Sequence, residues 1–157
     1  MKRIVTGTGA DGSATILFEG APPTVVDFGK YVTTELWVTD ATPPAMHGAG
    51  DRSTREWALE PPPRGSCFRI VRINPDDATP SPPPAAEDEA GADFLEAHAT
   101  ATLDYVTVLS GEVTLIVGDR EVALGPGDPV VQQGVAHDWQ NRGSEPCVLV
   151  GVLLSAV

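Results

Sequence analysis

The chain has 157 residues and a formal net charge of −12, from 22 acidic and 10 basic side chains. This length predicts one domain over residues 1–157, with enough chain to bury a hydrophobic core. The negative electrostatic field of such a chain repels polyanions, so we expect no nucleic-acid partner. No apolar run approaches the ~20 residues that cross a membrane, and Met1–Thr6 contains no apolar signal core. Cys67 and Cys147 form no CxxC pair, which favours free thiols in a cytoplasmic protein.

Composition divides the chain into three stretches. Residues 1–73 and 98–157 contain short β-like runs between turns, whereas residues 74–97 are rich in proline and then in acidic residues. This middle stretch predicts an extended loop with one helical turn near Ala85–Ala90, and it is a candidate lid. The predicted strands are Arg3–Thr6, Ala14–Glu19, Thr34–Thr39, Cys67–Ile73, Thr100–Leu109, Glu112–Val117, Glu121–Leu124, Pro129–Gln132, His137–Gln140 and Cys147–Leu154. Many short strands between Gly-rich turns predict an all-β sandwich or barrel.

The segment Gly7–Gly12 matches the phosphate-binding pattern G-x-G-x-x-G. A dinucleotide site requires a helix to begin there, because the N-terminus of that helix holds the pyrophosphate. The residues that follow, Ser13–Phe18, have strand character instead. We therefore predict a hairpin turn at Asp11-Gly12 and no nucleotide cofactor.

A polar stripe follows the first predicted strand of the C-terminal stretch. Its members, spaced two residues apart and hence on one face of a strand, are His98, Thr100, Thr102 and Asp104. By the same alternation, His137 and Trp139 share a face. If the stripe faces a barrel interior, its polar groups need partners in one another, in water or in a metal ion. The alternative is the solvent face of a half-buried sheet.

Residues 98–151 resemble the barrel of the cupin superfamily, whose two motifs are G-x5-H-x-H-x3,4-E-x6-G and G-x5-P-x-G-x2-H-x3-N. The positions that keep the spacing of the first motif are His98, Asp104 and Gly111, with Thr100 at its second histidine and Asp104 at its glutamate. Those that keep the second are Gly134, His137 and Asn141, with Gln132 at its proline. The upstream segments Thr34–Trp37 and Phe68–Val71 also look similar to those of small stand-alone cupins.

This resemblance implies a double-stranded β-helix, or jelly roll. It also implies a homodimer that pairs through an edge strand or an N-terminal strand arm, for which residues 3–19 are the candidate. It also implies a site for a divalent ion (Zn, Fe, Mn or Ni) on His98, Asp104 and His137. Thr100 is a poor ligand, and aspartate is shorter than glutamate by one methylene. A metal-free polar pocket is therefore the alternative.

Other side chains are candidates for contact with a substrate. Glu35 and Trp37 alternate together on Thr34–Thr39, so Glu35 is a candidate proton donor or acceptor if that strand lines the barrel, and a solvated residue otherwise. Arg69 is a candidate to bind a carboxylate or enolate, or lies at the surface. Trp139 either walls the pocket or belongs to the core. Trp37 and Thr100 complete the set of candidate substrate contacts.

The resemblance implies an enzyme of secondary metabolism that acts on a carbonyl or polyketide-like compound. A lyase or isomerase would use the metal to polarise the carbonyl, for decarboxylation, dehydration or enolate-type isomerisation. Without metal, His137 or His98 would act as general acid or base with Asp104. The alternatives are a non-catalytic metabolite-binding protein and an Fe(II)-dependent oxygenase, because a fold alone does not choose a reaction.

Overall fold

The computed structural model describes residues 1–46, 50–78, 94 and 96–156. The predicted helical turn at Ala85–Ala90, the histidine at position 47 and most of the predicted loop 74–97 lie outside these residues. In the part described, the chain is built from β-strands and one short 3-10 turn, η1 (Arg52–Thr54), which confirms the all-β prediction. Within these residues, no helix is long and apolar enough to span a membrane.

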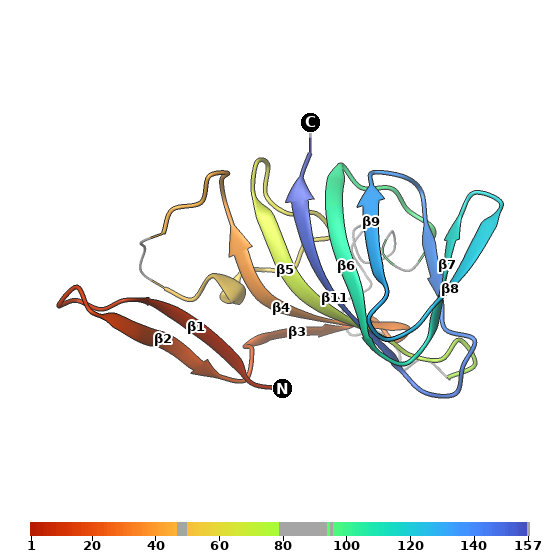
Figure 1. The fold of residues 1–157 in the computed structure, drawn as a ribbon, viewed down its shortest axis with the longest axis horizontal. Coiled ribbons are helices and arrows are strands. Elements are labelled where there is room, and N and C mark those ends of the chain that lie inside the picture. The colour runs from red at the N-terminus through yellow and green to blue at the C-terminus, as the bar shows by residue number, and fades with distance from the viewer. Residues whose placement is uncertain (47–49, 79–93, 95, 157) are drawn as a thin grey trace.

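The strands form three antiparallel sheets (Figure 1). The first is a hairpin of β1 (Arg3–Thr8) and β2 (Ala14–Gly20). The second has the order β3 (Thr24–Asp27), β4 (Tyr31–Thr39), β5 (Ser66–Ile73), β11 (Cys147–Ser155), β6 (Thr102–Ser110) and β9 (Pro129–Gln133). The third has the order β10 (Asp138–Gln140), β7 (Val113–Val117) and β8 (Arg120–Leu124). The ten predicted strands are present with shifted ends. A further strand, β3, which has four residues and follows Pro22-Pro23, was not predicted.

The six-stranded and three-stranded sheets share one hydrophobic core, as expected for a jelly-roll barrel. Ile73 and Leu149 of the larger sheet pack in the same cluster as Leu115 and Trp139 of the smaller one. Alternate side chains of both sheets therefore point into the interior. The polar stripe has to be accommodated in this interior.

A β-bulge in β4 changes which of its residues face the interior. Glu35 pairs with Arg69 and Trp37 pairs with Phe68, so the register shifts by one residue between them. A bulge places an additional residue in one strand and reverses the alternation beyond it. The prediction that Glu35 and Trp37 share a face is therefore wrong: Glu35 is buried, while Trp37 lies on the outer face, in a groove beside Phe68.

The predicted N-terminal arm is the β1–β2 hairpin, which projects from the barrel (red in Figure 1). Its turn contains Asp11-Gly12 as predicted, and Gly12 adopts a φ of +81°, which favours glycine. The side chain of Arg3 connects the hairpin to the remainder of the same chain. The guanidinium of Arg3 forms an ion pair with Asp51 and donates from Nη1 to the carbonyl of Leu36 at 3.0 Å.

Candidate active site

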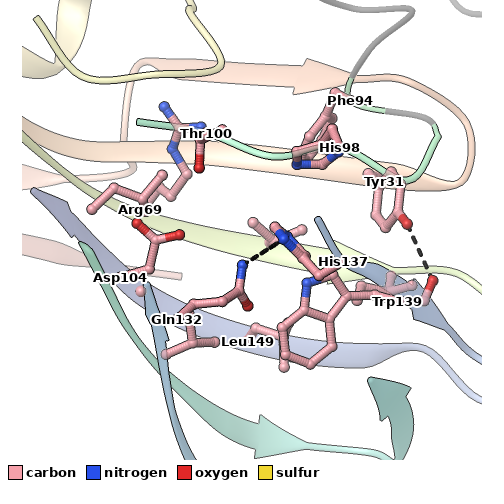
Figure 2. Close-up of a pocket in the computed structure, with 15 residues that line it drawn as sticks. Tyr31, Arg69, Phe94, His98, Thr100, Asp104, Gln132, His137, Trp139 and Leu149 are labelled. Carbon is pink, nitrogen blue, oxygen red and sulfur yellow. Dashed lines mark hydrogen bonds between the residues drawn. The ribbon is translucent and has the colours of Figure 1, made fainter. Parts of the chain in front are cut away.

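A cavity of about 80 Å³ lies inside the barrel (Figure 2). Its polar lining consists of Arg69, His98, Thr100, Asp104, Gln132 and His137. Its apolar lining includes Tyr31, Ile73, Phe94, Val106, Trp139 and Leu149. The cavity thus combines several titratable groups with an aromatic and aliphatic wall, which is the usual composition of a small-molecule site.

The polar stripe faces this interior. Thr100, Thr102 and Asp104 are buried, whereas Ala101 and Tyr105 on the opposite face are exposed. The hydroxyls of Thr100 and Thr102 are 2.7 Å apart and satisfy one another. The solvent-face alternative is therefore wrong, although β6 begins only at Thr102.

His98 and His137 form a pair that is fixed by the backbone. Each donates its amide N–H to the carbonyl of the other, at 3.2 and 3.0 Å, and the ring centroids are 4.8 Å apart. Each ring also places Nδ1 near the carbonyl two residues earlier: that of Glu96 at 2.8 Å and that of Val135 at 3.0 Å. Because a carbonyl only accepts hydrogen bonds, each Nδ1 atom carries a proton, and a neutral ring then keeps its lone pair on Nε2.

His137 is held as a neutral imidazole. Burial lowers its pKa, and the nearby His98 lowers it further, against the opposing effect of the Val135 carbonyl. The amide nitrogen of Gln132 lies 2.8 Å from the ring nitrogens of His137, so it is placed to donate to the bare Nε2. His137 is therefore available as a base near neutral pH.

Asp104 is shifted in the opposite direction. Burial raises the pKa of its carboxyl group, against the lowering effects of the Thr102 hydroxyl and of the charges of Arg69 and His98. Its Oδ1 atom is buried and has no hydrogen-bond partner. A carboxyl group with these properties retains its proton more readily than an exposed one.

Arg69 and Glu35 form a buried ion pair. The Nε atom of Arg69 is 2.9 Å from Oε1 of Glu35, in contact but not aligned for a hydrogen bond. Both side chains are at most 4% exposed, so the surface alternatives for these residues are wrong. The two Nη atoms of Arg69 donate to the carbonyls of Leu59 and Ala58, at 3.2 and 2.8 Å.

The two members of this pair differ in their access to the cavity. Arg69 lines it, whereas Glu35 lies behind Arg69 and lines a second hollow with Cys67. Burial raises the pKa of Glu35, and Arg69 opposes that shift. The structure therefore does not bring Glu35 or Trp37 to the cavity, although it does bring the remaining predicted site residues there.

The residues present do not fit the three-ligand metal site that the resemblance implies. Among the described residues, no group of three or more His, Cys, Asp and Glu side chains is close enough to hold an ion. The amide nitrogen of Gln132 also lies 2.8 Å from both ring nitrogens of His137 and so competes with an ion for that imidazole. Figure 2 shows Asp104 near Arg69, away from His98.

Among the lining residues that were not predicted as part of the site are Gln132, Phe94 and Tyr31. Gln132 follows from the alternation of Pro129–Gln132, which places it on the inner face with Val130. Phe94 lies in the acidic loop, where composition gives no signal. Tyr31 donates its hydroxyl to the carbonyl of Trp139 at 3.1 Å and so supports the wall of the cavity. Trp139 both walls the cavity and belongs to the core.

The fold and its interior site define a jelly-roll barrel of the kind that binds small molecules. More particularly, residues 86–153 are a cupin domain, because they match the Cupin_2 family model. Two curated relatives are the phomopsin biosynthesis cluster proteins C' and D of Diaporthe leptostromiformis. Each is 31% identical over 112 residues, which cover 68% of this chain and 51% of the relative. The chain therefore spans about half the length of these relatives.

Solved structures show likeness of fold. The polyketide cyclase RemF from Streptomyces resistomycificus has a TM-score of 0.49 and 15% identity, over 84% of this chain and 73% of that one. A structure of Fe(II) HppE has a TM-score of 0.47 and 15% identity, over 98% of this chain and 56% of that one. The Cupin_2 domain of an XRE-family transcriptional regulator from Enterobacter cloacae has a TM-score of 0.46 and 16% identity, over 80% and 96%. These likenesses carry no information on the reaction.

Proposed function

We propose that the chain is an enzyme that moves protons next to the carbonyl group of a small molecule, as a lyase or isomerase. One observation supports this most directly: a single cavity contains a neutral imidazole, His137, and a buried carboxyl group, Asp104, whose pKa values are shifted in opposite directions. The two shifts bring the pKa values toward each other, which increases the fraction of the protein that holds a neutral imidazole as base together with a protonated carboxyl group as acid. The two relatives named for a biosynthesis cluster support a role in secondary metabolism.

The roles follow from these protonation states. For dehydration, Nε2 of His137 removes the proton α to the carbonyl, and an enolate forms. Asp104 then donates its proton to the β-hydroxyl, the carbon–oxygen bond breaks, and water leaves as the double bond forms. Solvent returns the proton from His137 to Asp104. Arg69 lines the same cavity, but its guanidinium is paired with Glu35 and donates to the carbonyls of Leu59 and Ala58, so we assign it no direct bond to the enolate.

The test is exchange and elimination in deuterated water. Incubation with a panel of β-hydroxy ketones, followed by NMR, is expected to show deuterium at the α carbon or loss of the hydroxyl group. His137→Gln and Asp104→Asn should each reduce the rate by roughly 10²–10⁴-fold with the fold intact. Asp119→Asn, in the exposed turn after β7, is the matched control. Equal rates in all four proteins would reject the proposal.

One observation favours the non-catalytic alternative. The amide of Gln132 is placed to donate to the same lone pair of His137 that the base would use. A binding protein keeps this contact, whereas the enzyme has to exchange it for substrate. Binding of a panel ligand without deuterium exchange or elimination would support the binding protein.

We also propose a homodimer, formed through the outer face of the six-stranded sheet. A row of apolar side chains in register crosses five strands of this face: Trp37, Phe68, Val152, Tyr105 and Val131. The two neighbouring rows on the same face contain no charged residue. One row runs across the strands from Thr34 to Pro129, and the other runs from Thr39 to Gln133. In a chain of charge −12, two copies approach with least repulsion through such a face.

A further inference from the structure

The cavity contains two buried hydrogen-bond acceptors without partners. Oδ1 of Asp104 and Oε1 of Gln132 are both inaccessible and accept no hydrogen bond from the described residues. Both side chains line the same cavity. Since nearly all buried polar atoms in folded proteins have a partner, two such acceptors at one cavity indicate that a ligand supplies the donors.

The orientation of the Gln132 amide follows from its neighbour. The Val135 carbonyl fixes the proton of His137 on Nδ1, so Nε2 is an acceptor. The structure places the NH₂ end of Gln132 toward His137, 2.8 Å from both Nδ1 and Nε2, and so directs the oxygen away from the imidazole (Figure 2). The amide thus presents an acceptor, and not a donor, to the remainder of the cavity.

The rest of the lining restricts the ligand further. Phe94, Trp139 and Leu149 form an apolar wall, which suits an unsaturated or aromatic carbon skeleton. A ketone or carboxylate oxygen only accepts hydrogen bonds, so it cannot pair with the oxygen of Gln132, although it can accept from a protonated Asp104. A hydroxyl group is small enough for the cavity and donates one hydrogen bond.

We propose that Gln132 Oε1 and Asp104 Oδ1 form a hydroxyl-recognition subsite, so that the substrate is a hydroxylated carbonyl compound with an unsaturated skeleton. This inference rests on the proposed function, and it adds the two acceptor atoms that would recognise a hydroxyl group of the substrate. Gln132 acts here as a specificity-determining residue, because its oxygen distinguishes a hydroxylated compound from the same skeleton without donors.

The test measures binding without turnover. Catechol, under nitrogen, is compared with 1,2-difluorobenzene, which has a similar size and no donors, by NMR titration of the backbone amides and of the Trp139 indole N–H. The native chain is expected to bind catechol at least about tenfold more tightly, since the hydroxyls replace missing hydrogen bonds. Gln132→Met should reduce the affinity for catechol several-fold and leave that for 1,2-difluorobenzene unchanged. Gln133→Met, which changes the exposed neighbour on the outer face of β9, is the matched control.

Equal affinity of the native chain for the two compounds would overturn the subsite, and this comparison needs no variant to fold. An equal loss in Gln132→Met and Gln133→Met would also overturn it. The proposed proton transfer fails by a different result, the absence of exchange and elimination with the substrate panel. The two proposals can therefore be rejected separately.

Discussion

His98 and His137 are joined by two backbone hydrogen bonds, and their rings meet edge to face with centroids 4.8 Å apart. At this separation a proton on one imidazole opposes a proton on the other. The pKa of the more buried ring, His137, is therefore lowered by the nearby His98 in addition to the larger effect of burial.

The pH dependence of stability should report this neutral imidazole. Because the pKa of His137 is lower in the folded than in the unfolded chain, the unfolded chain binds more protons below about pH 6.5. The free energy of unfolding should therefore fall as pH falls from 7.5 to 5.5. In His137→Gln this contribution is absent, so the fall should be smaller. Urea denaturation of both proteins at pH 7.5 and 5.5 measures these free energies of unfolding. The same fall in His137→Gln as in the native chain would contradict a neutral, buried His137.

Asp104 should have the opposite effect. Its pKa is raised in the folded chain, so ionisation is unfavourable there, and stability is lost as pH rises through the folded pKa. Asp104→Asn, which cannot ionise, is expected to raise the melting temperature at pH 7.5 more than at pH 4. Asp119→Asn should show no such difference. A melting temperature that is lowered equally at both pH values would indicate a structural role instead.

The buried pair of Arg69 and Glu35 should be costly to break from one side. Removal of one member leaves a buried charge without its partner, which costs about 3–5 kcal/mol. Glu35→Gln and Arg69→Met should each destabilise by about that amount, measured by urea denaturation. The double variant should lose less than the sum of the two single variants. Strict additivity would show that the ion pair contributes no coupling.

Metal content can be measured on tag-free protein by ICP-MS. Because the described residues form no three-ligand cluster, we expect well below one equivalent of Zn, Fe, Mn or Ni, with no change in His98→Ala or His137→Ala. About one equivalent that both variants abolish would establish the site implied by the cupin motifs. Its identity would then separate Lewis-acid chemistry from the oxygen chemistry of an Fe(II)-dependent enzyme.

The proposed dimer can be tested with a matched pair of valines. Val131 lies in the apolar row and is 58% exposed, whereas Val122 lies on β8 of the other sheet and is 43% exposed. Val131→Arg places a charge in the proposed interface and should give a monomer by light scattering after gel filtration. Val122→Arg should leave the dimer intact. A monomeric native chain would reject the interface.

Alternation along strands was enough to predict most of the interior. It placed Thr100, Asp104, His137 and Trp139 on the faces they occupy, because regular strands repeat every two residues. It failed at Glu35 and Trp37, since a bulge depends on pairing with another strand and leaves no mark in the composition of β4. The ion pair of Glu35 with Arg69 likewise depends on the register of β4 and β5.

The orientation of side chains inside the cavity could not be predicted from the sequence, for a different reason. The tautomers of His98 and His137 are set by carbonyls of neighbouring residues, and these point inward only after the chain has turned. The place of Gln132 beside His137 is a contact between the end of β9 and the residue before β10. The resemblance to cupins supplied the positions of the ligands, but not the substitution of an amide for one of their contacts.

The bulge in β4 also controls the N-terminal hairpin. Leu36, the additional residue, has no partner in β5, and its carbonyl accepts instead from Arg3 of β1. In a perfectly regular β4, that carbonyl would accept a hydrogen bond within the sheet. Arg3 would then keep only Asp51 and Ser53 as hydrogen-bond partners. The hairpin is thus joined to the barrel where β4 is irregular, so a deletion that removed the bulge would change both the attachment of the hairpin and the faces occupied by the residues beyond it.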